Sequence, residues 1–350
     1  MRIGAIDSPG FACLAPMAGA TDLPFRVLVK ELGAAFVYTE LVSATGLLRG
    51  GQGSRRLVET HESEHPVGIQ LFGGDPGELG DAAALVESLG VGDLIDLNMG
   101  CPVPKVVSLG AGAALMRDPA KVERLVAAVA RSVRIPVTAK IRAGWNDSEI
   151  NAPEVARAIE AGGGSAVAVH ARTREQRHAG AVDLDLVAEV KRSVAIPVLA
   201  NGGIRTATDA FAVREATGAD GVMIGRGAIE HPWVFREIAA LSEGRELATV
   251  TAAERVLFVE RHLALARERG TRTEAETISA MRPQLQRYTA GLPGAAAFRR
   301  AIEKATTFSE CLERFRAMVE EGRQPSSRAS GSPKSANVMS VASASGSLCA

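Results

Sequence analysis

Short apolar runs recur along the first two thirds of the chain, and each run is followed by turn residues and a helix-like segment. The eight runs lie near Ala12–Ala15, Ala35–Thr39, Val67–Leu71, Leu94–Asn98, Val137–Ile141, Ala166–His170, Val198–Asn201 and Gly221–Ile224. They show no regular alternation with polar residues, as is typical of parallel strands that are covered on both faces. Strand–helix units of about 30 residues fit their spacing. The pattern predicts an α/β fold, a (β/α)8 TIM barrel over residues 1–244, with a doubly wound sheet as the structural alternative.

The remaining third follows a helical pattern. Residues 252–269 and 274–322 have amphipathic spacing, with a turn at Gly291-Leu292-Pro293-Gly294. We therefore expect a small C-terminal helical domain over residues 245–323. Pro, Ser, Gly and Ala dominate residues 324–350, where large apolar side chains are few. Such a segment cannot bury enough apolar surface to order itself, so it is predicted to be a disordered tail.

Composition narrows the class of protein without indicating a reaction. Hydrophobic residues make up 46% of the 350 residues, which is enough for a large core. No apolar run reaches the roughly 18 residues of a membrane helix, and the first residues lack the apolar stretch of a signal peptide. The four cysteines, Cys13, Cys101, Cys311 and Cys349, form no CxxC pair and no metal-ligand spacing. We expect a cytoplasmic monomer without a membrane segment or a metal.

The net charge of the chain is zero, but the charges are unevenly distributed. Residues 1–244 contain 24 Lys and Arg against 29 Asp and Glu, whereas residues 245–323 contain 14 against 11. The predicted helical domain is therefore basic and the predicted barrel acidic. Because such a bias is also typical of a solvated helix face, it indicates an RNA contact only together with the motifs below.

One loop carries the strongest indication of chemistry. The fourth apolar run ends on Asn98, and Gly100 and Pro102 then favour a turn that places Cys101 just beyond the carboxyl end of a strand. Barrel enzymes keep their active sites at that end. An isolated cysteine is more often a small buried apolar side chain, but the turn residues on both sides favour a functional role.

The loops after the seventh and eighth strands indicate a bound phosphate. Gly202-Gly203 and Gly225-Arg226 stand where many barrels hold a phosphate. Glycine lets backbone N–H groups approach an anion, and arginine adds charge and donors. The alternative is two ordinary barrel turns. The chain has neither a GxGxxG sequence nor a P-loop motif, so those two nucleotide folds are not indicated.

Lys140 lies within the fifth apolar run, and a lysine inside a barrel is costly unless an anion accompanies it. Together with the two glycine loops it favours a phosphorylated cofactor. The alternative is a Schiff-base lysine of the kind found in barrel aldolases. His170 and Asn201 end neighbouring strands, so we expect them in the same site, although an isolated histidine would more often be a satisfied core residue.

These motifs resemble those of a known enzyme family. Asn98-Met99-Gly100-Cys101-Pro102, followed by Lys105-Val106-Val107 and by Gly110–Met116, is similar to the signature of tRNA-dihydrouridine synthases. The similarity extends from about Leu14 to about Ile302 and is closest to the bacterial B-type members. It implies an FMN enzyme that uses NADPH or NADH and reduces the C5=C6 bond of specific uridines in tRNA.

The resemblance also implies roles for site residues. Lys140 would lie against the flavin ring and Gln70 at its polar edge, with the backbone of Pro16, Met17 and Ala18 packed on the ring. Cys101 would act as the general acid that gives a proton to C5 while a hydride goes to C6; a nucleophilic cysteine is the alternative. The other predicted flavin contacts are His170, Asn201, Gly202, Gly203, Gly225 and Arg226. The predicted substrate contacts are Asn98, Lys105, Arg142 and Arg172.

The chain departs from the family pattern at several positions. Gly203 stands where many members have aspartate, and Pro104 where a basic residue is common. Pro283-Gln284 stands where members usually have Lys-His, which removes basic character from a helix expected to face RNA. Pro283 is also expected to kink or start that helix. These departures affect RNA binding more than the catalytic assignment.

Two other functions fit parts of the pattern. A barrel flavin oxidoreductase could reduce a free small molecule, but the helical domain and the Cys101 motif argue against it. A tRNA-binding protein without catalysis would need neither Cys101 nor Lys140, and both are present.

Overall fold

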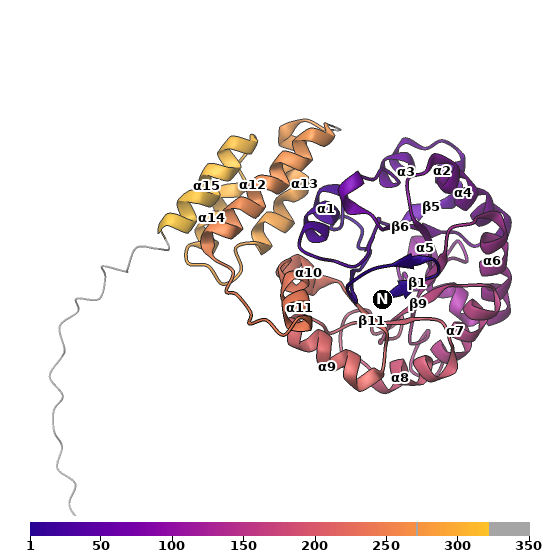
Figure 1. Ribbon diagram of the computed structural model, residues 1–350. Helices are drawn as coiled ribbons and strands as arrows, with labels where there is room; N and C mark the ends of the chain where they lie inside the picture. Colours follow the sequence, from indigo (N-terminus) through magenta and orange to yellow (C-terminus); the bar gives the residue numbers. More distant parts are fainter. Residues whose placement is uncertain (271, 322–350) are drawn as a thin grey trace, which may run out of the picture.

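Eight parallel strands form a barrel in the computed structural model, which describes residues 1–270 and 272–321. The tail predicted for residues 324–350 lies outside these residues. Hydrogen bonds place the strands in the order β3-β11-β10-β9-β8-β7-β6-β4, and Figure 1 shows them as a ring. The strands are β3 (Ala12–Leu14), β4 (Val37–Tyr38), β6 (Val67–Phe72), β7 (Leu94–Asn98), β8 (Val137–Arg142), β9 (Ala166–His170), β10 (Val198–Asn201) and β11 (Gly221–Ile224).

The ring closes between β3 and β4. The backbone N–H of Ala35 donates to the carbonyl of Ala12 (2.8 Å), and that of Leu14 donates to the carbonyl of Phe36 (2.9 Å). A short strand, β5 (Val42–Ser43), pairs with the end of β6. Each predicted apolar run coincides with one barrel strand to within two residues. The predicted TIM barrel is therefore confirmed, and the doubly wound alternative is wrong.

Helices cover the outside of the barrel (Figure 1). The Asp75 side chain caps α4 by accepting a hydrogen bond from the Glu78 N–H, and Asp118 caps α6 in the same way. A proline follows each cap, where its fixed φ suits the first helical turn. The longer helices are α1 (Leu23–Glu31), α4 (Pro76–Leu89), α6 (Pro119–Ser132), α7 (Ala152–Ala161), α8 (Leu184–Ser193), α9 (Ala207–Thr217) and α11 (Val234–Ser242). Shorter helices in the connections are α2 (Ala44–Leu48), α3 (Gln52–Leu57), η1 (Glu62–Glu64), α5 (Pro104–Val107), η2 (Gly112–Arg117) and α10 (Arg226–Glu230).

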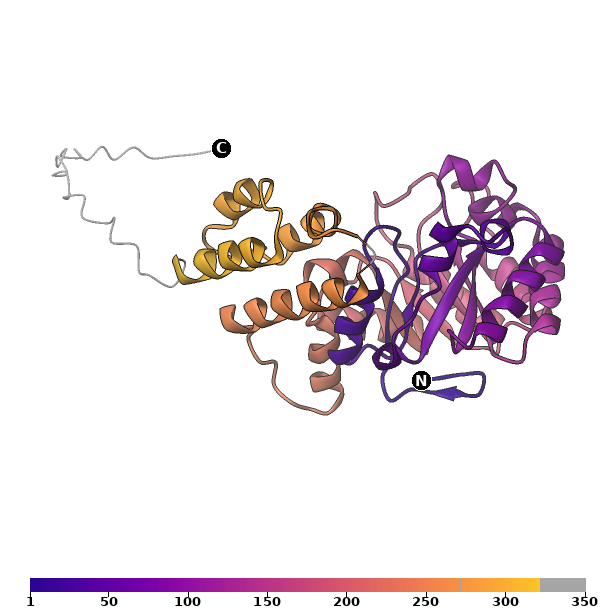
Figure 2. The same ribbon diagram turned by 90° about the horizontal axis from the view of Figure 1, so that it is seen from above.

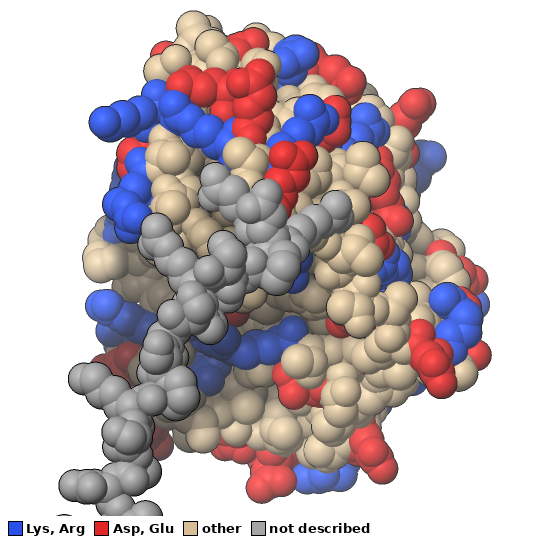
Figure 3. Space-filling model, turned by 90° about the vertical axis from the view of Figure 1, so that its left-hand side faces the viewer, with Lys and Arg blue, Asp and Glu red and all other residues tan. Residues whose placement is uncertain are grey.

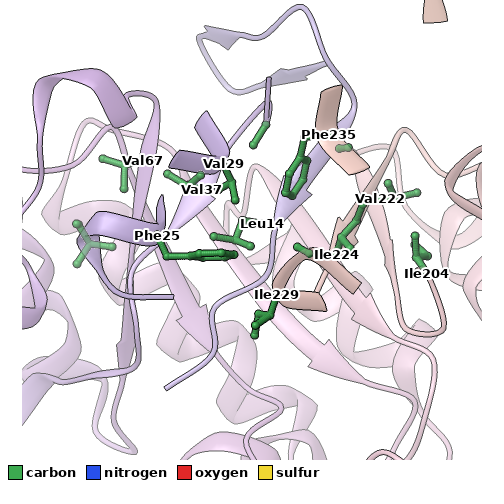
Figure 4. Close-up of a cluster of buried hydrophobic side chains, with 14 of the residues drawn as sticks. Leu14, Phe25, Val29, Val37, Val67, Ile204, Val222, Ile224, Ile229 and Phe235 are labelled. Atoms are coloured by element: carbon green, nitrogen blue, oxygen red, sulfur yellow. The ribbon is translucent and has the colours of Figure 1, made fainter. Parts of the chain in front are cut away.

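Aliphatic packing joins the barrel to its helices. Figure 4 shows part of this layer, where Leu14 and Val222 of the strands face Phe25 of α1 and Phe235 of α11. These side chains are fully or almost fully buried. Continuous apolar strands are thus explained by burial on both faces, since a second apolar cluster fills the barrel interior.

A hairpin that the sequence pattern did not predict covers one end of the barrel (Figure 2). Its strands are β1 (Arg2–Ile3) and β2 (Ile6–Asp7). Ile3 is fully buried in the cluster that fills the barrel interior. A Cβ at Gly4 would touch Pro136 and lie near Ser165, which directly precede β8 and β9. The hairpin therefore closes the amino end, so access to the interior is from the carboxyl end.

Four further helices form a separate bundle beside α1 and α11 (Figures 1 and 2). They are α12 (Ala252–Arg269), α13 (Glu274–Arg287), α14 (Ala295–Ile302) and α15 (Phe308–Glu321). The predicted turn at residues 291–294 separates α13 from α14, whereas the break between α14 and α15 was not predicted. Pro283 lies inside α13, so the expectation that it could start this helix is wrong.

Aromatic side chains attach the helical bundle to the barrel. Trp233, just before α11, lies 5.0 Å from Phe258 of α12, and Phe258 lies 5.1 Å from Tyr288 at the end of α13, measured between ring centroids. The Nε2 of Gln284 donates to the carbonyl of Ala20 in the loop after β3 (2.7 Å). Gln284, one of the departures from the family pattern, therefore ties α13 to that loop.

Within residues 1–270 and 272–321, no helix combines the length and the apolar character needed to cross a membrane.

Candidate active site

A cavity of about 430 Å³ opens at the carboxyl ends of the barrel strands. Parallel strands bring their last residues to one rim, so side chains far apart in sequence meet there. Every predicted site residue except one lines it: Pro16, Met17, Ala18, Gln70, Asn98, Cys101, Lys140, Arg142, His170, Arg172, Asn201, Gly202, Gly203, Gly225 and Arg226. The exception, Lys105, is exposed on α5 outside the lining, and its contact with substrate stays a prediction.

The cavity is strongly basic. Six lining residues are lysine or arginine, and no Asp or Glu belongs to the lining among the described residues. Burial, reinforced by the charge of Arg142, lowers the pKa of Lys140 to about 7. Burial and the cationic groups around it also lower the pKa of His170. Such a concentration of positive charge favours an anionic ligand.

Lys140 is held by an amide instead of a carboxylate. Its Nζ donates to the Oδ1 of Asn201 (2.9 Å), whose Nδ2 donates to the backbone carbonyl of Met223 (2.6 Å). No ion pair involves Lys140 within residues 1–270 and 272–321. The side chain is half-buried, and an ammonium that is partly removed from water with a neutral hydrogen-bond partner is costly. Its charge is therefore available to a bound anion.

The Cys101 loop is fixed by backbone hydrogen bonds. The Cys101 N–H donates to the Oδ1 of Asn98 (2.9 Å), and the Cys101 carbonyl accepts from the N–H of Ala113 (3.1 Å). Gly112 has a positive φ of 60°, and a Cβ there would lie 2.8 Å from the Cys101 carbonyl oxygen. The glycine-rich segment is therefore required for the close approach of η2 to this loop. Cys101 itself is half-buried and lines the cavity.

Two predicted substrate contacts have another role in the structure. Arg142 donates through Nε to the carbonyl of Gly100 (2.7 Å) and through Nη1 to those of Thr173 (3.0 Å) and Arg177 (2.9 Å). Arg172 donates through Nε and Nη2 to the carbonyl of Gly180 (3.1 and 2.7 Å). Both arginines line the cavity, but these donors hold the surrounding loops, so any contact with substrate falls to their remaining N–H groups.

A buried network lies beneath the Cys101 loop. Asp96, which is 1% exposed, accepts hydrogen bonds from Gln70 Nε2 (2.6 Å) and Thr138 Oγ1 (2.7 Å). The Oε1 of Gln70 accepts in turn from the Nδ2 of Asn98 (2.9 Å). Gln70 therefore has one amide hydrogen and one lone pair left for a ligand.

Several lining residues were not found from the sequence. His178 lies 5.8 Å from His170 between ring centroids, in the loop after β9. Arg205 follows β10, and Arg287 comes from α13 of the helical bundle. Arg287 stands three residues after Gln284, on the helix face that contacts the barrel. That spacing could have indicated it only if the docking of α13 were known.

The chain is similar to a group of curated RNA-modifying enzymes. A family model described as "Dihydrouridine synthase (Dus)" matches residues 13–322. The tRNA-dihydrouridine synthase B of Pseudomonas aeruginosa is 42% identical over 306 residues, covering 85% of this chain and 90% of that protein. The tRNA-dihydrouridine synthase B of Pseudomonas syringae pv. tomato is 40% identical, covering 85% of this chain and 88% of that protein. A probable tRNA-dihydrouridine synthase of Rickettsia conorii is 37% identical, covering 86% and 91%.

Proposed function

The chain belongs to the dihydrouridine synthase family, and from this premise we propose that it reduces specific uridines in tRNA to 5,6-dihydrouridine as an FMN-dependent oxidoreductase in the cytoplasm. The observation that carries the proposal is that Cys101 and Lys140 line the same basic cavity at the carboxyl end of the barrel. A thiol and an anion-binding lysine in one cavity suit a reaction that combines a redox cofactor with a proton donor.

The residues of the cavity fit FMN. A volume of about 430 Å³ lies within the usual range for cofactor sites. Gly202 has a φ of 117°, and a Cβ there would lie 3.0 Å from the His170 ring, so only glycine suits this loop. The phosphate would be held at Gly202, Gly203, Gly225 and Arg226. Small and apolar residues at Pro16, Met17 and Ala18 would support the ring, with Gln70 and Lys140 at its polar atoms.

Bound FMN, kept reduced by NADPH or NADH, would supply the hydride for C6 of uracil. The protein supplies the rest. Cys101, which lines the cavity, would give a proton to C5, and Asn98 holds its loop in position. Asn201 orients Lys140 so that its charge faces the cavity.

The helical bundle is proposed to bind the RNA. Residues 245–323 carry a net charge of +3 from 14 basic and 11 acidic residues. On the face that carries the bundle, Figure 3 shows Lys and Arg side chains crossing a hollowed part of the surface. Arg287 of α13 reaches the cavity lining itself. A nucleotide that enters the cavity would therefore lie between the barrel and the bundle.

Analysis of tRNA by mass spectrometry tests the function directly. A strain that lacks the gene is expected to lose dihydrouridine at defined positions, and the intact gene should restore it. The purified protein should show flavin absorbance and form the same product with NADPH. A normal dihydrouridine content in the deletion strain, with a flavin-loaded protein that reduces only small molecules, would contradict the proposal.

FMN binding is expected to take up a proton through Lys140. Because the pKa of Lys140 is lowered to about 7, the amine is mostly neutral at pH 8. The ring atoms proposed to lie at Lys140 are hydrogen-bond acceptors, and the phosphate adds negative charge to the same cavity. Both favour the ammonium form and raise this pKa, so a proton is bound as FMN binds. Calorimetry in buffers of different ionisation enthalpy should show uptake approaching one proton at pH 8 and little uptake below pH 6. Lys140→Met should abolish the uptake, and an unchanged uptake in that variant would exclude Lys140 as its source.

Arg287→Ala is expected to weaken tRNA binding in a salt-dependent way. A phosphate contact releases counterions, so its loss should reduce the slope of log affinity against log salt by about one. Filter binding or fluorescence anisotropy between 50 and 200 mM salt, a range suited to this effect, measures the slope. Arg192→Ala is the control, because Arg192 is exposed on α8 outside the cavity lining. Equal slopes for the two variants would contradict a contact at Arg287.

A further inference from the structure

We infer that Asp96 is a positioning residue, which sets the orientation of the Cys101 loop through the side chains of Gln70 and Asn98. Asp96 does not line the cavity, and the sequence marks it only as a carboxylate within an apolar run. Its importance follows from the direction of three consecutive hydrogen bonds. The expected effect on the reaction rate rests on the proposed function, whereas the expected effect on the Cys101 loop does not.

The three hydrogen bonds that join Asp96, Gln70, Asn98 and Cys101 form a relay, and the strand register brings its members side by side. Asp96 of β7 pairs with Gln70 of β6 on one side and with Thr138 of β8 on the other. Asn98 is two residues along β7, so its side chain points to the same face as that of Asp96. Asp96 thus lies one layer below Asn98 inside the barrel, and Cys101 follows at the rim.

A carboxylate can only accept hydrogen bonds, and this fixes the direction of the relay. Asp96 Oδ2 accepts from Gln70 Nε2 at 2.6 Å, so the Oε1 of Gln70 must face away from Asp96. That oxygen accepts from Asn98 Nδ2 at 2.9 Å. The Oδ1 of Asn98 is thereby turned to the N–H of Cys101 at 2.9 Å.

Reversing the direction of these hydrogen bonds would remove the one that holds the Cys101 loop. An amide side chain has nearly the same shape after its oxygen and nitrogen exchange places. If Gln70 turned over, Asn98 would have to turn over as well and present its NH2 to the Cys101 N–H. Two donors would then face each other, and the loop would lose its side-chain hydrogen bond. The reversal would also turn the Gln70 oxygen toward the Asp96 carboxylate. Because Gln70 and Asp96 are both 1% exposed, water could not readily replace the hydrogen bond lost between them.

Geometry carries the direction of the hydrogen bonds, because both oxygens of Asp96 accept from a donor, Gln70 Nε2 and Thr138 Oγ1. Burial raises the pKa of Asp96 above its ordinary value, and the hydrogen bonds from Thr138 and Gln70 and the charge of Lys140 reduce this rise. Asp96→Asn keeps the shape of the side chain but can both donate and accept, so it no longer dictates how Gln70 is oriented. This single exchange separates the directing role of Asp96 from its packing.

Alkylation of Cys101 tests the inference without measuring turnover. The flavin-loaded protein is treated with iodoacetamide, and modification of the Cys101 peptide is followed by mass spectrometry. Asp96→Asn and Asn98→Ala are each expected to accelerate alkylation about fivefold, the factor that corresponds to one lost hydrogen bond. The buried thiols of Cys13 and Cys311 should stay unreactive, which shows that the fold is intact.

The double variant gives the decisive comparison. If Asp96 acts through Asn98, Asp96→Asn should add nothing to the alkylation rate of Asn98→Ala. Multiplicative effects would overturn the inference, as would an unchanged rate in Asn98→Ala, which can be read even if Asp96→Asn fails to fold. Thr138→Val is the matched control, because it removes the other hydrogen bond on Asp96 (2.7 Å) and leaves the relay intact. An acceleration in Thr138→Val equal to that in Asp96→Asn would also overturn it.

Kinetics then connects the relay to the reaction. In Asp96→Asn, the tRNA-dependent step should slow about tenfold, while the NADPH-dependent loss of flavin absorbance should change less than twofold, in keeping with a role confined to the acid. In a Cys101→Ala background, Asp96→Asn should have no further effect. If the wild-type protein lacks activity on tRNA, the proposed function fails while the alkylation result still decides the role of Asp96.

Discussion

Cys101→Ala is expected to slow the tRNA-dependent step by about 10²–10⁴-fold, the usual contribution of a positioned general acid. The NADPH-dependent loss of flavin absorbance should stay near its normal rate. The two steps differ because the thiol serves the proton transfer to uracil and not the reduction of the cofactor. Stopped-flow absorbance measures them separately, first with NADPH alone and then with tRNA added to the reduced enzyme.

The structure supports a clean interpretation of this variant. The hydrogen bonds that hold the loop use the backbone of Cys101, one to Asn98 and one from Ala113. Removing the thiol therefore leaves the loop and the rest of the cavity in place. Cys101→Ser is the shape-conserving control and should recover little activity, because a hydroxyl is a much weaker acid than a thiol.

Two outcomes would count against the role of Cys101. Slower reduction by NADPH with normal turnover of tRNA would move the thiol to the cofactor side of the reaction. No change in either step would make Cys101 a packing residue, the ordinary role of an isolated cysteine in a protein.

The barrel could be predicted because its signal is local and repeated. Each strand is an apolar run with turn residues behind it, and eight repetitions favour a closed barrel over a doubly wound sheet. The hairpin of β1 and β2 was missed because two-residue strands carry no periodicity. The break between α14 and α15 was missed because residues 303–307 contain neither glycine nor proline.

The members of the site were predictable for a topological reason. Residues at the carboxyl ends of parallel strands meet at one rim, so Gln70, Lys140 and His170 could be grouped before any contact was known. What the side chains bind was not predictable. Arg142 donates to three backbone carbonyls of loops whose paths depend on the whole fold.

Long-range docking was beyond the sequence as well. Arg287 lines the cavity because α13 is held against the barrel by Gln284 and by the contacts of Phe258 with Trp233 and Tyr288. Asp96 differs from its neighbours in one respect, because it is a carboxylate within the otherwise apolar run Leu94–Leu97. A charged residue in the middle of a buried strand needs partners, and here the partners lead to Cys101.

Glu64→Gln is expected to lower the free energy of unfolding by about 3–5 kcal/mol, the usual cost of breaking a buried ion pair from one side. Arg26 and Glu64 are 2% and 0% exposed, with 2.7 Å between Nε and Oε2. Without the carboxylate, the guanidinium would stay buried with only carbonyl partners. Chemical denaturation followed by circular dichroism measures the loss.

The surface pair of Arg316 and Glu260, with side chains 47% and 46% exposed, provides the control. Glu260→Gln should change the free energy of unfolding by less than about 1 kcal/mol, because exposed pairs contribute little. Similar losses in Glu64→Gln and Glu260→Gln would show that burial does not determine how much these ion pairs contribute to the free energy of unfolding.

Glu64→Gln is also expected to weaken the binding of FMN. Arg26 Nη1 also donates to the carbonyl of Thr21 (3.2 Å), and the hydroxyl of Thr21 accepts from the N–H of Met17 (2.9 Å). Met17 lines the cavity where the flavin ring is proposed to lie. Loss of the Glu64 carboxylate frees Arg26 to shift, so the loop should become less ordered and FMN should bind more weakly in Glu64→Gln. Fluorescence titration of the folded protein without denaturant measures this affinity. Normal FMN binding in a destabilised Glu64→Gln protein would show that the loop is held without Arg26.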